Sequence, residues 1–199
     1  MREQEKLYYD RRATEYDDWW LGTGLFEQRD RPGWDEEVER LVATIAGLEP
    51  CRVLDVACGT GFLTRHLRGE VTALDQSEAM LAIAAERLPG ATIVRADAPP
   101  LPFADKRFDR VFTSHFYGHL EEPLRSEFLS EASRVAPELV VVDSAGPDRE
   151  ERQGRILNDG SEHEVYKRWF RAETLARELH GDVLMDGDWF VAVLVGSSW

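Results

Sequence analysis

The chain of 199 residues is poor in cysteine, and no apolar run in it approaches the roughly 20 residues that span a bilayer. Its two cysteines, Cys51 and Cys58, are too few for a disulfide framework or a structural zinc site. The first residues are charged and lack the apolar stretch of a signal peptide. We therefore expect a cytoplasmic protein with no metal centre and no membrane partner.

Basic charge is also scarce. The chain has 24 Lys and Arg against 38 Asp and Glu, a formal net charge of −14. Binding to a nucleic-acid backbone requires a positive surface, so we expect no nucleic-acid partner. Because 43% of the residues are hydrophobic, the chain can bury a core, and its length suits one domain over residues 1–199. A small-molecule substrate and a monomer or homodimer fit these features.

Short apolar runs alternate with helical patterns along most of the chain. Strands are predicted at 53–56, 71–75, 91–94, 109–114 and 139–142, and a closing antiparallel pair at 183–185 and 190–195. The predicted helices cover 9–20, 38–45, 63–67, 77–88, 123–135 and 172–179. Strands that alternate with helices predict an α/β fold, in which helices cover both faces of a mostly parallel, doubly wound sheet.

The glycine-rich loop after the first predicted strand is the expected ligand site, because ligands bind beyond the carboxyl ends of such strands. A dinucleotide site would place a third glycine where Thr64 stands. An acid within the strand, Asp55, suits the cationic end of a nucleoside that carries an amino acid. Asp75 ends the next strand and can accept both hydroxyls of a ribose. These features disfavour a dinucleotide oxidoreductase.

Three segments carry a family resemblance. Residues 53–61 (Val-Leu-Asp-Val-Ala-Cys-Gly-Thr-Gly) resemble the first motif of class I S-adenosylmethionine-dependent methyltransferases, 74–80 their ribose motif, and 96–103 with 108–111 their adenine motif and fourth strand. The resemblance implies a Rossmann-like fold with a seven-stranded sheet and S-adenosylmethionine as cofactor. The cofactor-binding residues it implies are Arg12, Tyr16, Asp55, Ala57, Gly59, Gly61, Asp75, Gln76, Met80, Asp97, Ala98 and Ser114.

The sequence departs from this pattern at Ala57, where many members have glycine. The change should matter only if the residue needs a positive φ. Residues 8–17 resemble the amino-terminal helix that covers the cofactor in several small-molecule members, so we expect residues 1–34 to form a helical lid. In that lid, Arg12 and Tyr16 could meet the cofactor carboxylate, and Tyr9 could meet the substrate.

His115 and His119 follow the fourth predicted strand and flank Phe116 and Tyr117. Either histidine could act as a general base, since a neutral hydroxyl or amine must lose a proton during methylation. His115 and Tyr117 are also predicted substrate contacts. A purely structural role for His119, satisfying a loop carbonyl, stays open.

Residues 146–171 are predicted to form a hairpin insert on the substrate side. If Asn158-Asp159-Gly160 is a three-residue loop with Gly160 left-handed, Arg155 and Lys167 point to one face. Together they would form a cationic clamp for an anionic acceptor. The segment also resembles small-molecule O-methyltransferases that act on acids, including phosphonates, which implies that Arg155 and Lys167 contact the substrate.

These observations predict methyl transfer from S-adenosylmethionine to an oxygen of a small anionic or hydroxylated metabolite. Methylation of nitrogen or carbon remains an alternative, as does a module that binds the cofactor without turning it over.

Overall fold

The computed structural model describes residues 3–196, with side chains from residue 7 onward. Within these residues, seven strands form one sheet in the order β3-β2-β1-β4-β5-β9-β8. Their bounds are β1 Cys51–Val56, β2 Gly69–Asp75, β3 Thr92–Arg95, β4 Arg110–Ser114, β5 Glu138–Ser144, β8 Asp182–Asp186 and β9 Phe190–Val195. β9 pairs antiparallel with both of its neighbours, and the other pairings are parallel. The predicted fold class is confirmed.

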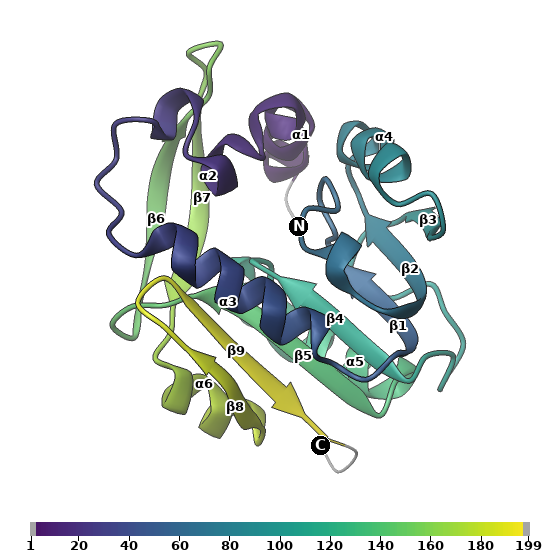
Figure 1. The fold of residues 1–199 in the computed structure, drawn as a ribbon. Coiled ribbons are helices and arrows are strands. Elements are labelled where there is room, and N and C mark those ends of the chain that lie inside the picture. Colours follow the sequence, from purple (N-terminus) through teal and green to yellow (C-terminus); the bar gives the residue numbers. More distant parts are fainter. Residues whose placement is uncertain (1–2, 197–199) are drawn as a thin grey trace.

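Helices cover both faces of this sheet (Figure 1). Helices α3 (Trp34–Ala46) and α4 (Glu78–Arg87) lie on one face, and α5 (Leu124–Val135) and α6 (Ala172–Leu179) lie on the other. β1 shows the reason, because successive side chains of a strand point to opposite faces. Val53 packs into the cluster with α3, whereas Leu54 and Val56 pack into the cluster with α5 and α6. Both faces of β1 are therefore apolar.

The sheet order reverses at β1, because β2 lies on one side of it and β4 on the other. This switch leaves a crevice at the carboxyl edge, where ligands bind in doubly wound sheets. The helix after β2 begins as predicted, since the Ser77 hydroxyl accepts a hydrogen bond from the Met80 amide at 3.2 Å.

A two-stranded hairpin stands apart from the main sheet (Figure 1) and consists of β6 (Arg149–Ile156) and β7 (Glu162–Trp169). The amide of Leu157 donates to the carbonyl of Ser161 at 3.0 Å, and Gly160 has a φ of +80°. Arg155 on β6 pairs with His163 on β7. Lys167 follows His163 by four residues on β7, so its side chain points to the same face. The predicted three-residue loop is thus confirmed, with Arg155 and Lys167 on one face of the hairpin.

The amino-terminal segment differs from the single helix predicted over 9–20. Helix α1 covers Glu3–Arg12, a short 3-10 turn covers Ala13–Glu15, and helix α2 covers Asp18–Leu21. The break lets Asp17 turn toward the glycine-rich loop, where its carboxylate accepts hydrogen bonds from Thr60 and Arg87, both at 2.6 Å. α1 itself lies between α4 and the hairpin, above the carboxyl edge of the sheet (Figure 1).

The helix predicted over 63–67 is also wrong, because that segment forms only the 3-10 turn Thr64–His66. Two glycines explain the tight connection. A Cβ on Gly61 would lie 2.9 Å from the Leu88 side chain, and one on Gly69 would lie 2.1 Å from the carbonyl oxygen of Cys51. The chain is pressed against its neighbours at both ends, which leaves no room for a full helix.

Among the helices of residues 3–196, none combines the length and the apolar character needed to span a membrane. The same residues contain no cluster of three His, Cys, Asp or Glu side chains that could hold a metal ion.

Candidate active site

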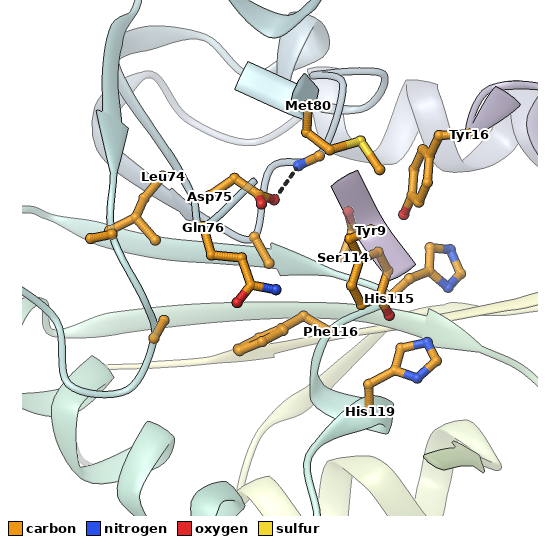
Figure 2. Close-up of a pocket in the computed structure, with 14 residues that line it drawn as sticks. Tyr9, Tyr16, Leu74, Asp75, Gln76, Met80, Ser114, His115, Phe116 and His119 are labelled. Carbon is orange, nitrogen blue, oxygen red and sulfur yellow. Dashed lines mark hydrogen bonds between the residues drawn. The ribbon is translucent and has the colours of Figure 1, made fainter. Parts of the chain in front are cut away.

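A cavity opens at the carboxyl ends of β1, β2 and β4, at the switch in strand order (Figure 2). It encloses about 560 Å³, counting the open space at its mouth. Its lining includes these predicted residues: Tyr9, Tyr16, Ala57, Gly59, Asp75, Gln76, Met80, Ala98, Ser114, His115 and His119.

Asp75 is the acid of this cavity. Its Oδ2 accepts a hydrogen bond from the Gly59 amide at 2.9 Å (dashed in Figure 2), and its Oδ1 accepts one from the Ser77 amide at 2.9 Å. Burial raises its pKa, while these amide hydrogen bonds oppose the rise. The Gln76 amide also hydrogen-bonds to this carboxylate. A carboxylate has about four acceptor positions, so three amides leave capacity for a ligand. The carboxylate is therefore held in one orientation and can accept further hydrogen bonds from a ligand.

The glycine-rich loop reaches the same cavity through Ala57 and Gly59. Both adopt a positive φ, +59° and +55° respectively. A Cβ on Gly59 would lie 3.5 Å from the ring of Tyr16, in the space between loop and lid. Many family members have glycine at the position of Ala57. Because alanine has a Cβ, it is strained at this positive φ, whereas glycine would not be.

Asp55 does not line the cavity, contrary to its predicted contact with the cationic end of the ligand. Its side chain is 1% exposed, and its Oδ2 accepts a hydrogen bond from the Thr64 hydroxyl at 2.6 Å. Its Oδ1 has no hydrogen-bond partner among the described residues. Burial raises the pKa of Asp55 to about 8. The acid lies beneath the loop, because its side chain alternates onto the face covered by α3 and α4.

Three other predicted residues lie outside the cavities. Gly61 packs against Leu88. Asp97 is exposed and lines neither this cavity nor the second one described below, although its neighbour Ala98 lines this cavity. Tyr117 is wholly buried in the core, where its hydroxyl donates to Glu178 at 2.7 Å. The 3-10 turn Tyr117–His119 rotates Tyr117 inward, so the predicted substrate contact at Tyr117 is wrong.

A second cavity adjoins the first and opens between the lid and the hairpin. Its basic lining residues are Arg12, Arg29, Arg31, Arg155 and Lys167, against the acids Asp30 and Asp188. An excess of cations is notable in a chain with a net charge of −14. Such a lining favours an anionic ligand.

Arg155 is the clearest unpaired cation of the second cavity. Its Nε is buried and has no hydrogen-bond partner among the described residues. Burial lowers the pKa of its guanidinium, and the nearby Arg12 lowers it further. Arg155 is half-buried, and no ion pair to an acid is found for it among the described residues, so an oxyanion that enters the cavity would stabilise its guanidinium.

Lys167 is differently placed. Its Nζ lies 2.6 Å from Oδ1 of Asp143, and both side chains are almost fully buried. Oδ2 of the same carboxylate accepts the Gly118 amide at 2.7 Å. Lys167 lines the second cavity, but its charge is already matched, so Arg155 carries more of the predicted clamp.

Four residues line both cavities and so form the neck between them: Tyr9, Tyr16, His115 and His119. Figure 2 shows the two histidines and the two tyrosines on the side of the cavity opposite Gln76. All four were predicted from the sequence to contact cofactor or substrate.

The two histidines of the neck are neutral. Burial lowers the pKa of each to about 3. Nδ1 of His119 lies 2.5 Å from the carbonyl oxygen of Tyr166, which can only accept, so Nδ1 carries the proton. Nε2 of His119 then keeps a free lone pair. Nδ1 of His115 lies 3.3 Å from the Ser144 hydroxyl, and its buried Nε2 has no partner among the described residues.

Comparisons with known proteins agree with this geometry. Residues 53–138 match a family model described as a methyltransferase domain. The chain is similar over nearly its whole length to two solved structures, a DhpI–SAH complex (27% identity, 99% of this chain and 97% of that one, TM-score 0.72) and a DhpI–SAM–HEP complex (26% identity, 97% and 96%, TM-score 0.73). These matches make the chain similar to the class I S-adenosylmethionine-dependent methyltransferases.

Curated relatives of this chain include a demethylmenaquinone methyltransferase of Thermotoga maritima, 33% identical over 60% of this chain and 55% of that protein. Another is phthiotriol/phenolphthiotriol dimycocerosates methyltransferase 1 of Mycobacterium ulcerans, 39% identical over 55% of this chain and 42% of that protein. The chain thus spans about half the length of the curated relatives it matches.

The first cavity of this chain fits S-adenosylmethionine, the cofactor of the similar solved structures. The fixed carboxylate of Asp75 offers lone pairs for the ribose hydroxyls, and the space above Gly59 admits a ligand against the loop. Met80, Phe116 and Ala98 supply apolar surface for an adenine ring.

Sequence reasoning missed two parts of the site. One is Asp143, the buried partner of Lys167, which lies in an apolar run that gave no functional signal. The other is a group of three tryptophans that line the second cavity together with Trp169 of the hairpin: Trp19, Trp34 and Trp189. They belong to separate segments, so no local spacing connected them.

Proposed function

We propose that this methyltransferase transfers a methyl group from S-adenosylmethionine to an oxygen of a small anionic acceptor. The observation that carries the proposal is the second cavity, which adjoins the cofactor cavity and holds Arg155, whose buried Nε has no hydrogen-bond partner among the described residues. Its position beside the cofactor site is where an acceptor must lie, and its charge selects the acceptor.

In this proposal the first cavity holds the cofactor. Asp75 accepts the ribose hydroxyls, Gln76 and Ala98 lie along the nucleoside, and Met80 packs on the base. Arg12 and Tyr16 reach in from the lid. Arg12 is oriented by a hydrogen bond to the Tyr8 hydroxyl at 2.6 Å and has no acid partner among the described residues, so it suits the carboxylate of the amino-acid end.

When bound, the cofactor supplies an activated methyl group on a sulfonium. The residues of this chain then have to orient the acceptor oxygen and exclude water. Arg155 orients the oxyanion from the hairpin. Tyr9 and Tyr16 close the neck from above, because α1 is fastened to α4 by a hydrogen bond between Ser77 and Asp10 at 2.5 Å.

His119 supplies the proton acceptor when the acceptor oxygen is still protonated. Its Nδ1 proton is held on the Tyr166 carbonyl, which leaves the Nε2 lone pair for the acceptor. An oxyanion that is already ionised needs no base. His119 is therefore needed only for acceptors whose oxygen is protonated, and acceptors that are already ionised can react without it.

A methyl-transfer assay with labelled cofactor tests the proposal. Carboxylic and phosphonic acids are compared with amines of the same carbon skeleton, and we expect turnover with the acids. Turnover of the amines alone would contradict the choice of acceptor. Binding of S-adenosylhomocysteine without turnover of any compound would indicate a module that does not catalyse transfer.

Variants of neighbouring residues on β6 sharpen this assay. Arg155→Ala should raise KM for the acid by roughly 10- to 100-fold, the range expected for one charged hydrogen bond. Arg155→Lys should recover part of that loss. Ile156→Ala is the matched control, because Ile156 is 60% exposed on the opposite face of the strand. Equal KM values for Arg155→Ala and Ile156→Ala would remove Arg155 from the acceptor site.

A further inference from the structure

The second cavity gathers tryptophan as well as positive charge. Of the six tryptophans in the chain, four line this cavity: Trp19, Trp34, Trp169 and Trp189. They come from α2, the start of α3, the end of β7 and the turn before β9. Residues this far apart in sequence meet only through the fold, so their meeting is a property of the cavity.

Three of these rings form a continuous aromatic wall. The Trp19 and Trp34 ring centroids are 4.9 Å apart and meet edge to face, and those of Trp34 and Trp189 are 5.4 Å apart in the same manner. The polar edges are satisfied by backbone, since Nε1 of Trp34 donates to the carbonyl of Trp20 and Nε1 of Trp189 donates to that of Pro32. The indole positions are thereby fixed without any ligand.

Core packing accounts for only part of this wall. Trp34 is 4% exposed and belongs to the apolar core together with Trp20, which stacks on Phe62 and Phe190 at 4.8 and 5.5 Å. By contrast, Trp19, Trp169 and Trp189 are only partly buried and keep surface on the cavity. Large aromatic surfaces left open in a concave site are typical of ligand contact.

The charged and aromatic parts of the lining have different chemistry. Arg155 and Arg12 offer guanidinium donors next to the neck residues Tyr9 and Tyr16, whereas the tryptophans offer flat apolar surface. The lining extends from Arg155 to Trp169 and Trp189, so a ligand whose head group is held by Arg155 can also reach flat apolar surface. A matching ligand has an anionic head and a flat apolar body.

We propose that the acceptor is an aryl acid, a molecule that carries its reactive oxyanion on an aromatic body which packs against Trp19, Trp169 and Trp189. This inference rests on the proposed function and adds the class of acceptor. The oxyanion lies toward Arg155 and the neck, and the ring lies toward the mouth of the cavity. Either a carboxylate or a phosphonate satisfies the head group.

Binding can be measured without turnover. Isothermal titration on the protein saturated with S-adenosylhomocysteine compares phenylacetate with acetate and phenylphosphonate with methylphosphonate. We expect each aryl acid to bind at least tenfold more tightly than its methyl counterpart, because one good aromatic contact contributes about that factor. Equal affinities within both pairs, or no binding of either aryl acid, would overturn the inference. The pair that binds more tightly identifies the head group.

Two variants assign the preference to the aromatic lining. Trp169→Leu and Trp19→Leu should each reduce the aryl preference severalfold and leave the affinity for the methyl acid within about twofold. Ile156→Ala, on the outer face of the same hairpin, should change neither value. An aryl preference that is intact in both tryptophan variants would contradict the proposed packing of the ring on Trp19 and Trp169.

Methyl transfer measured in parallel separates this inference from the proposed function. Turnover of acetate or methylphosphonate with no aryl preference would sustain the function and overturn the inference. Tight binding of the aryl acids with no turnover would sustain the binding class and overturn the function.

Discussion

Asp143 of β5 and Lys167 of β7 form a buried ion pair that joins the hairpin to the main sheet. Nζ and Oδ1 are 2.6 Å apart, and the two side chains are 5% and 0% exposed. The carboxylate also accepts the amides of Gly118 and Ser144, so its charge is fully compensated. Burial raises the pKa of Asp143, but the charge and hydrogen bond of Lys167, together with His115, hold it below its usual value.

Lys167→Met should therefore destabilise the protein by about 3–5 kcal/mol, because it leaves an uncompensated buried carboxylate. Urea denaturation at neutral pH measures this change. Arg152→Met is the control, since Arg152 lies on the exposed side of the hairpin and its ion pairs with Glu121 and Glu164 are solvent-accessible. The control should change stability by less than about 1 kcal/mol. Equal effects of the two variants would contradict the importance of the buried pair.

Ala57→Gly should raise the stability of the protein by about 1 kcal/mol. Ala57 has a φ of +59°, a conformation that costs a residue with a Cβ about that amount and costs glycine little. Thermal unfolding with and without S-adenosylhomocysteine measures the gain. Ala57→Val should act in the opposite direction. A lower melting temperature for Ala57→Gly would show that this φ carries no strain.

The sequence predicted most of the sheet, since strands buried on both faces read as short apolar runs. The hairpin register followed from Asn158-Asp159-Gly160 alone, because a left-handed Gly160 fixes which residues pair. Helix α6 has the predicted bounds, for its apolar side chains recur at helical spacing.

The errors lie where tertiary contacts override local pattern. The 3-10 turn Thr64–His66 replaces a helix because Gly61 and Gly69 are pressed against distant backbone and side chains. Tyr117 turns into the core to reach Glu178, sixty-one positions away in the sequence. The cofactor contacts were predictable from motif and strand order, whereas the partner of Lys167 and the tryptophan wall depend on how remote segments pack.

Asp55 predicts a pH-dependent stability. Its folded pKa is about 8, above the ordinary value of 3.8, so between these values the folded chain binds a proton that the unfolded chain has lost. Stability therefore falls as pH rises through this window and levels off above it. Asp55→Asn keeps an oxygen for the Thr64 hydroxyl and removes the titration.

The melting temperature of Asp55→Asn minus that of the unsubstituted protein should increase from pH 5 to pH 8 and then remain constant. Thermal melts across pH 5–9 provide the measurement. A difference that does not vary with pH would contradict a protonated Asp55.

The low pKa values of His115 and His119 predict that the stability of the protein depends on pH in the opposite direction. Their folded pKa values, about 3, lie below the ordinary 6.5, so below pH 6.5 the unfolded chain binds protons that the folded chain does not. Stability should fall as pH decreases from 6.5 toward 3. His119→Gln should lose less stability over this range in urea denaturation. His119 should cause no inflection near pH 6.5 in the pH profile of kcat/KM. The profiles of the unsubstituted protein and of His119→Gln should therefore have the same shape around that pH.

The most direct test of the account is the affinity of S-adenosylhomocysteine, measured by isothermal titration, for the unsubstituted protein and for Asp75→Ala. We expect clear binding to the former and about a 100-fold loss in the variant, since two hydrogen bonds to a charged acceptor disappear. Glu78→Gln, an exposed acid three positions away, should bind as the unsubstituted protein does. Undiminished affinity in a folded Asp75→Ala variant would contradict the assignment of this cavity to the cofactor.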